Sequence, residues 1–101
     1  MDFQVIWAAS GVRDFDDIIR YATEPSAAGA ETLRDRILES ISVLIRMPYI
    51  GPVYERDRSG RTREILCGSY RIFYRVTETP AQVQIVRVWH GSRKEPRLPP
   101  A

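Results

Sequence analysis

Two neighbouring stretches decide the fold: YRIFYRV at residues 70–76 and QVQIVRVW at residues 82–89. Both are rich in the β-branched and aromatic residues that favour strands. In the first stretch, apolar residues occupy every second position, and two arginines and Phe73 occupy the positions between them. One face of this strand is therefore predicted to be apolar, and the other to carry Arg71 and Arg75.

The second stretch has apolar residues at both odd and even positions. Val83 and Ile85 belong to one face of an ideal strand, and Val86 and Val88 belong to the other. A strand that is apolar on both faces is typical of the interior of a sheet, so this strand is predicted to be central.

The sequence before residue 70 supplies the other elements. Apolar residues recur at helical spacing in two segments, and β-forming residues are concentrated in two others. Ser10 and Ser26 are the expected N-caps of the two helices, and Pro48 ends the second helix. The predicted elements are a strand at residues 2–7, helices at residues 10–23 and 26–47, and a strand at residues 63–67.

The predicted fold class is α+β with the order β-α-α-β-β-β: an N-terminal strand, an antiparallel helical hairpin and a three-stranded antiparallel meander. The helices need an apolar partner, so we expect them to cover one sheet face and to leave the face with Arg71 and Arg75 uncovered. We expect residues 1–101 to form a single domain, because this length suits one core. Prolines near the end exclude regular structure, so the tail is expected to be frayed over about 95–101.

Charge is distributed unevenly along the chain. Residues 1–50 carry five arginines against eight acids, whereas residues 51–101 carry ten basic residues against five acids. The basic second half favours a polyanionic or acidic partner. Arginine outnumbers lysine by fourteen to one. This excess suits bidentate pairing with phosphate or carboxylate, and codon usage in a genome rich in G and C explains it equally well.

The composition also excludes several classes of protein. No apolar run approaches the roughly 20 residues of a membrane span, and the start of the chain lacks the features of a signal peptide. Cys67 is the single cysteine and His90 the single histidine, too few for an internal disulfide or a metal cluster. We therefore expect a cytoplasmic protein that has no cofactor, no bound metal, no membrane contact and no small-molecule ligand.

Five short motifs follow one another along the chain: Trp7-Ala8, Pro48 to Gly51, Arg63-Glu64-Ile65-Leu66, the stretch at residues 70–76, and Val86-Arg87-Val88-Trp89-His90-Gly91-Ser92-Arg93. In this order, and on a chain of this length, they resemble the RelE/ParE superfamily of toxins, and the ParE branch more than the RelE branch. The resemblance covers roughly residues 3–97. It implies the toxin of a type II toxin–antitoxin pair, neutralised by a cognate antitoxin whose C-terminal segment wraps around it.

The superfamily inhibits growth in two ways, and the resemblance leaves both open. ParE-like members act on DNA gyrase and block replication. RelE-like members are ribosome-dependent endoribonucleases that cut messenger RNA in the ribosomal A site. The expected partners are therefore the antitoxin and DNA gyrase, with the ribosome and messenger RNA as the alternative target. A degenerate member that binds only its cognate partner is a third possibility.

A few positions distinguish the two branches. Arg71 and Arg93 stand at two arginine positions of the RelE-like ribonucleases, but Thr62 and Glu64 stand where lysines are expected, and the tail has no tyrosine. RNA cleavage needs groups that transfer protons, and Glu64 and His90 are the remaining candidates. If the chain is a ribonuclease, its candidate catalytic residues are thus Arg71, Arg93, His90 and Glu64. The two departures favour a non-catalytic inhibitor.

Basic residues of the second half are the candidates for contact with the target or the antitoxin. They are Arg61, Arg63, Arg71, Arg75, Arg87, Arg93 and Lys94. The alternative for the strand arginines is a solvated face with cross-strand glutamate partners. The edge strand at residues 2–7 or 63–67 offers unpaired backbone groups to the antitoxin.

Overall fold

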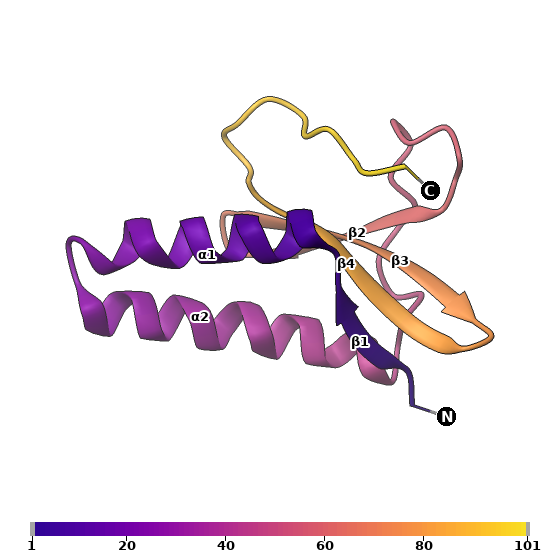
Figure 1. Cartoon of the computed structure of the whole chain (residues 1–101), viewed down its shortest axis with the longest axis horizontal. Coiled ribbons are helices and arrows are strands. Elements are labelled where there is room, and N and C mark those ends of the chain that lie inside the picture. The colour runs from indigo at the N-terminus through magenta and orange to yellow at the C-terminus, as the bar shows by residue number, and fades with distance from the viewer. Residues whose placement is uncertain (1, 101) are drawn as a thin grey trace.

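The computed structural model describes residues 2–100 and contains a strand, a helical hairpin and three further strands (Figure 1). The elements are β1 (Gln4–Trp7), α1 (Ala9–Thr23), α2 (Ala27–Ser42), a short 3-10 helix η1 (Val43–Ile45), β2 (Thr62–Cys67), β3 (Tyr70–Glu78) and β4 (Ala81–His90). The predicted α+β class and the order β-α-α-β-β-β are confirmed. Within these residues, no helix is both long enough and apolar enough to cross a membrane.

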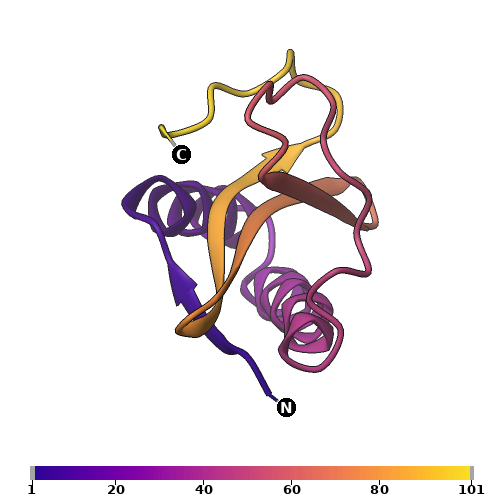
Figure 2. The same cartoon turned by 90° about the vertical axis from the view of Figure 1, so that its right-hand side faces the viewer.

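The four strands form one mixed sheet in the order β1-β4-β3-β2. The pairs β2–β3 and β3–β4 are antiparallel, which confirms the meander, and β1 pairs with β4 in parallel. β4 is therefore an inner strand, as its two apolar faces predicted, while β1 and β2 are the edges. Figure 2 shows the C-terminal tail and the loop before β2 together at the top of the molecule, with both helices below the tail.

A β-bulge in β4 explains why both of its faces are apolar. The register shifts between Phe73 and Tyr74 of β3, which leaves Val86 as the extra residue of β4. Ile85 and Val88 therefore both reach the core beneath the helices, although their numbers differ in parity. Val86 packs on the opposite face.

The main core lies between the helical hairpin and the sheet. Ile37 of α2, Leu44 of η1 and Ile72 of β3 are fully buried there. Burying an aliphatic side chain of this size contributes roughly 1.5–3 kcal/mol. The hydroxyl of Tyr74, also fully buried, accepts a hydrogen bond from the backbone N–H of Gly51 at 2.9 Å, so its polar group is satisfied.

One of the two predicted helix caps is confirmed and the other is wrong. Ser26 caps α2, because its hydroxyl accepts from the N–H of Gly29 at 2.9 Å. α1 begins at Ala9, so Ser10 lies inside the helix and caps nothing. Its hydroxyl instead donates to the carbonyl of Val86 at 2.6 Å, at the bulge of β4.

Gly11 marks the closest approach of α1 to β4. A Cβ atom on Gly11 would lie 2.5 Å from the carbonyl oxygen of Ile85, so a side chain there forces the helix away from the sheet. We expect Gly11→Ala to lower the free energy of unfolding by about 1–3 kcal/mol, despite a gain in helix propensity of about 1 kcal/mol.

The control is Gly29→Ala on the exposed surface of α2, where an added Cβ would meet only the side chain of Ser26, 3.2 Å from its hydroxyl oxygen. Urea denaturation followed by circular dichroism measures both variants. Equal stabilities for the two alanine variants would contradict the close packing of α1 on β4.

Candidate functional site

Arg71, Arg75 and Arg87 project from the sheet face opposite the helices, which we call the arginine face. In β3 the two arginines flank Phe73, and Arg87 of β4 pairs with Phe73 in the ladder. The direction of these side chains follows the predicted alternation. The arginine face is nevertheless not open to solvent, because other parts of the chain cover it.

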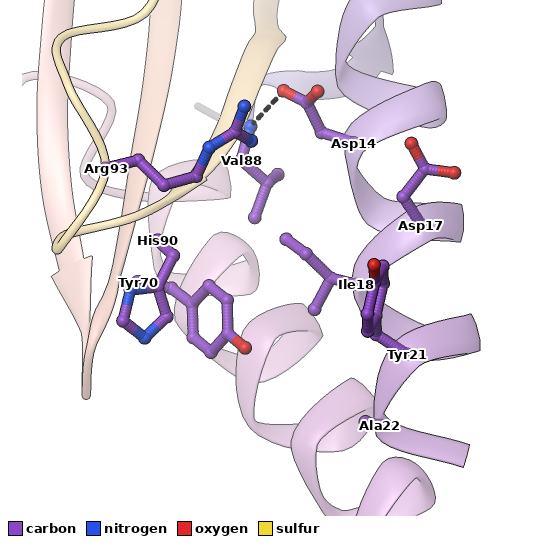
Figure 3. Close-up of a pocket in the computed structure, with 9 residues that line it drawn as sticks. All are labelled: Asp14, Asp17, Ile18, Tyr21, Ala22, Tyr70, Val88, His90 and Arg93. Atoms are coloured by element: carbon purple, nitrogen blue, oxygen red, sulfur yellow. Dashed lines mark hydrogen bonds between the residues drawn. The ribbon is translucent and has the colours of Figure 1, made fainter. Parts of the chain in front are cut away.

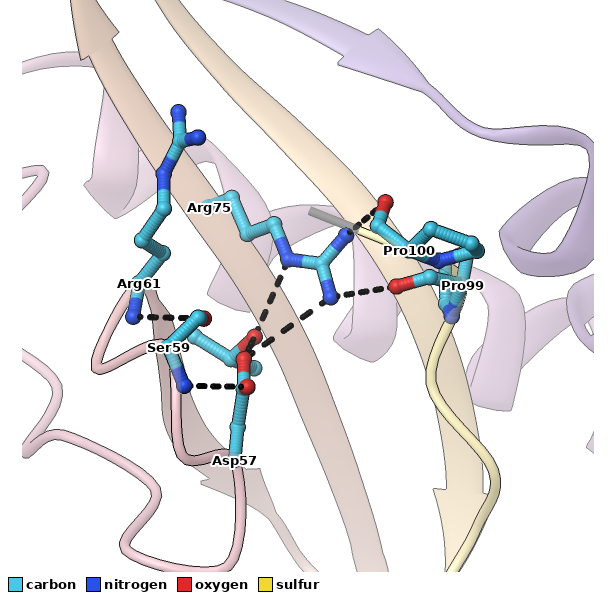
Figure 4. Close-up of polar contacts among 7 residues, drawn as sticks. Asp57, Ser59, Arg61, Arg75, Pro99 and Pro100 are labelled. Carbon is cyan, nitrogen blue, oxygen red and sulfur yellow. Dashed lines mark hydrogen bonds and ion pairs between the residues drawn. The ribbon is translucent and has the colours of Figure 1, made fainter.

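The main cover is the segment 95–100, which we call the C-terminal strap. All three arginines donate hydrogen bonds to it: Arg71 to the Glu95 carboxylate at 3.1 Å, Arg75 to the carbonyls of Pro99 and Pro100 at 2.6 and 3.0 Å, and Arg87 to the carbonyl of Arg97 at 2.8 Å. Figure 4 shows the two bonds from Arg75. The tail that we expected to be frayed over about 95–101 thus has contacts up to residue 100, and Ala101 lies outside the described residues.

A small apolar cluster lies beneath the strap. Phe73 and Val86 are fully buried in it, and Tyr54 and Trp89 complete it. The rings of Tyr54 and Phe73 meet edge to face, with centroids 4.8 Å apart. Leu98 of the strap packs against this cluster, so apolar contact as well as hydrogen bonding holds the strap in place.

Arg71 lies between two carboxylates and above an aromatic ring. It donates to Glu64 of β2 and to Glu95 of the strap, and its guanidinium lies 4.9 Å from the centroid of Phe73. The bond to Glu64, more than any other contact, raises the pKa of Arg71. The bond from Arg71 lowers the pKa of Glu95, while burial and the bond to Glu95 raise the pKa of Tyr54 to about 12. Arg71 therefore has a glutamate partner on the neighbouring strand, as expected if the strand arginines have a structural role.

Arg75 is the most deeply buried of the three arginines, with 7% of its surface exposed. Its Nε donates to the hydroxyl of Thr62 at 3.0 Å, and its Nη2 lies 3.8 Å from the carboxylate of Asp57. Burial lowers the pKa of Arg75, and Asp57 partly opposes this shift. The bond from Thr62 lowers the pKa of Asp57. Arg61 is exposed, and its guanidinium points away from this network (Figure 4).

Arg87 connects the sheet to α1. Its Nε and Nη2 donate to the two carboxylate oxygens of Asp14 at 2.7 and 2.9 Å, a bidentate pair. Asp14 also accepts from the backbone N–H of Val88 at 3.0 Å. The Arg87 guanidinium lies 4.6 Å from the ring centroid of Trp89. The charge of Arg87 is thus matched within the chain.

Two further candidate residues lie on the helix-covered side of the sheet. Arg63 donates to the carbonyl of Gly51 at 2.8 Å and so holds the loop that follows the helices. The Nδ1 of His90 accepts from the backbone N–H of Ser92 at 3.1 Å, and its ring meets Tyr70 edge to face. His90 and Arg71 therefore point to opposite faces of the sheet.

Arg93 and Lys94 lie directly after β4 and are exposed. The guanidinium of Arg93 stacks 3.6 Å from the ring centroid of Trp89, and the carbonyl of Lys94 accepts from the indole N–H of Trp89 at 2.7 Å. Of the seven basic residues predicted for binding, Arg61, Arg93 and Lys94 are exposed, and Arg63, Arg71, Arg75 and Arg87 are partly or fully buried.

Sequence reasoning missed an open groove of about 770 Å³ between α1 and the end of β4 (Figure 3). Its lining residues are Asp14, Asp17, Ile18, Tyr21, Ala22, Tyr70, Val88, His90 and Arg93. The signal available in the sequence was Tyr21, an aromatic residue outside the apolar stripe of the first helix, which is 79% exposed. Across residues 2–100, no group of three or more His, Cys, Asp or Glu side chains is placed to hold a metal ion.

The arrangement of helices and strands matches that of chains in solved toxin–antitoxin complexes. A chain of the RelBE2 complex from Mycobacterium tuberculosis superimposes with a TM-score of 0.67 at 22% identity, covering 89% of this chain and 99% of that chain. A chain of the chromosomal ParDE system from P. aeruginosa superimposes with a TM-score of 0.70 at 18% identity, covering 87% and 95%. No curated protein sequence matches the chain.

The fold is therefore that of the RelE/ParE-like toxins. The family model described as the ParE toxin of the type II toxin–antitoxin system parDE matches residues 5–95, almost the whole chain. The chain belongs to this ParE toxin family, which confirms the resemblance seen in its motifs.

The contrast between Arg75 and Arg61 gives a test of the buried network. Arg75→Ala leaves Thr62 and two carbonyls of the strap without their donors, and we expect it to destabilise the protein by about 2–4 kcal/mol. Arg61→Ala removes the same charge from an exposed position and should change stability by less than about 0.5 kcal/mol. Thermal and urea denaturation compare the two, and a mild effect of Arg75→Ala would show that its bonds do not hold the strap.

The bond between Glu95 and Arg71 makes the strap sensitive to acid. The pKa of Glu95 in the folded protein lies below its ordinary value of 4.5, so its stabilising contact is complete above that pH and is lost as the pH falls through the folded value. In a Trp7→Phe background, Trp89 is the single tryptophan, and it reports on the strap because Leu98 packs against the cluster that contains it. We expect its emission to shift to longer wavelength below about pH 4.5.

Glu95→Gln is the control for this titration. The amide cannot ionise, so the shift of Trp89 emission over the same range should be smaller in this variant. Far-UV circular dichroism at each pH separates release of the strap from global unfolding. An identical acid response with glutamine at position 95 would rule out Glu95 as the titrating group.

Proposed function

We propose that this chain is the toxin of a type II toxin–antitoxin pair, that it acts in the cytoplasm, and that it inhibits growth by binding DNA gyrase. Membership of the ParE toxin family supports the first part. Inhibition by binding requires a fitting surface and no catalytic group of its own.

The hydrogen bonds and positions of the candidate catalytic residues support inhibition by binding over catalysis. Glu64 is bonded to Arg71, and Arg71 is bonded to Glu95 as well, so neither is free to transfer a proton or to meet a phosphate. His90 lies on the other face of the sheet, away from both. General acid–base catalysis needs its groups within hydrogen-bonding reach of one reacting site, and these residues do not converge on one.

A cognate antitoxin fits two features of the surface. The groove beside α1 is lined by apolar residues such as Ile18 and Tyr21 as well as by charged ones, which suits an amphipathic helix. The edge strand β2 is covered by the preceding loop only in its first part, through bonds at Thr62 and Glu64. Its last part carries Leu66, which is 70% exposed and lies beside backbone groups that an added strand can pair with.

One observation favours the alternative, a ribosome-dependent endoribonuclease. His90 and Arg93 line the same groove, so an imidazole and a guanidinium share one open site (Figure 3). In that alternative, His90 transfers the proton and Arg93 stabilises phosphate charge. Glu64 and Arg71 would then have a structural role.

A supercoiling assay tests the gyrase proposal directly. Purified chain is titrated into DNA gyrase with relaxed plasmid and ATP, and we expect loss of supercoiling or accumulation of cleaved DNA. Addition of the cognate antitoxin should restore activity. In parallel, a translation reaction is sampled by primer extension, and we expect its messages to stay intact.

The variant His90→Ala, compared with Asp17→Ala on the α1 side of the same groove, distinguishes the mechanisms further. Growth arrest on induction should be unchanged in both variants if the toxin acts on gyrase. Codon-specific cuts in messenger RNA that vanish only in His90→Ala would establish the ribonuclease in place of the gyrase inhibitor.

A further inference from the structure

The ten basic residues in the second half of the chain fall into two groups by burial. Four of them, Arg63, Arg71, Arg75 and Arg87, are partly or fully buried and bond to other parts of the chain. The other six are exposed on the loop before β2 and on the tail after β4: Arg56, Arg58, Arg61, Arg93, Lys94 and Arg97. We call these six residues the cationic cap.

The three arginines of the loop before β2 lie beside the strap, whereas Arg93 lies at the groove beside α1 together with Asp14 and Asp17. Arg56 and Arg58 line the same pocket as Glu95 and Leu98 of the strap. Arg61 lines another pocket together with residue 100 at the end of the strap. Figure 1 shows the end of the C-terminal tail next to the loop before β2.

Little acidic charge remains to neutralise the part of the cap that the loop and the strap form. Within residues 2–100, none of the six ion pairs includes a member of the cationic cap. Two of the three acids in the same segments, Asp57 and Glu95, pair with Arg75 and Arg71 of the layer beneath. Glu55 is the remaining acid of the loop. Like charges gathered without counter-charges repel one another and attract a polyanion.

We propose that the cationic cap binds the phosphodiester backbone of duplex DNA. Arginine is suited to this contact because its planar fork pairs with phosphate oxygens. The cap lies on irregular backbone, and neither a helix nor a β-ribbon projects from it to enter a groove, so the contact is made to phosphates and has no sequence preference. This proposal rests on the proposed function and extends it, because an inhibitor bound to gyrase lies close to the DNA that gyrase holds.

The test is a salt titration of DNA binding by the full chain, without gyrase. Fluorescence anisotropy with a labelled 20-base-pair duplex gives the affinity at several salt concentrations. The affinity should fall with salt, since each phosphate contact contributes about 0.9 to the slope of log affinity against log salt. In the variant Arg56→Gln/Arg58→Gln/Arg97→Gln we expect this slope to fall by roughly 2 to 3, and the affinity at low salt to drop about tenfold or more.

The matched control is Arg20→Gln/Arg34→Gln/Arg36→Gln. It removes three exposed arginines from the helices, away from the cap, and gives the same net charge. Affinity and slope close to those of the unaltered chain are expected for this control. Circular dichroism confirms that both triple variants are folded.

Three outcomes overturn the DNA contact: no binding by the unaltered chain at low salt, equal losses in the two triple variants, or tighter binding of a single-stranded RNA of the same length through the same three arginines. These outcomes are separate from failure of the proposed function, which shows as undiminished supercoiling by gyrase in the presence of the chain. Arg56→Lys/Arg58→Lys/Arg97→Lys keeps the charge and should recover most of the salt slope.

Discussion

The pairing of three guanidinium groups, one buried and two partly buried, governs how the second half of the chain is arranged. A charge withdrawn from water is tolerated only when it is paired and its hydrogen bonds are made. Arg71 draws its partners from β2 and the strap. Arg75 draws them from β2, the loop before it and the strap, and Arg87 from α1 and the strap. The strap has no regular structure of its own, so its course follows from these bonds and from the burial of Leu98.

This arrangement separates two uses of arginine on one side of the molecule. The inner arginines act as connectors, because each joins segments that are distant in sequence and each has its charge matched by carboxylates or carbonyls. The outer basic residues are free of such partners among residues 2–100 and determine the electrostatic character of the surface. A partner that approaches this side therefore meets the cap and the strap before it meets the sheet.

Much of the fold could be predicted from local patterns. The alternation in residues 70–76 correctly assigned Arg71 and Arg75 to the face away from the helices, and Ser26 correctly identified the start of α2. These features depend on periodicity and on backbone bonds between near neighbours, which the sequence displays directly. The motifs between Trp7 and Arg93 correctly indicated the family.

The features that escaped prediction depend on partners far away in the sequence. The role of Ser10 follows from a bulge in β4. The sequence shows apolar residues at both odd and even positions of this strand, but that pattern does not give the position of a bulge. The cover over Arg75 comes from carbonyl groups of Pro99 and Pro100, and backbone carbonyls leave no mark in the pattern of residue types. The groove beside α1 depends on how far the helix stands from the end of β4, which the spacing of residues does not fix.

The parallel pairing of β1 with β4 has a consequence for how the chain folds. The helical hairpin is built from contacts between near neighbours, but the bond from Ser10 to Val86 closes a loop of 76 residues and the Asp14–Arg87 pair one of 73. Closing such loops costs entropy before any contact forms, so structures with many distant pairings fold slowly. β1 and the face of α1 that packs on the sheet therefore stay uncovered until β4 docks. A folding intermediate without β4 exposes this apolar surface and is prone to aggregate.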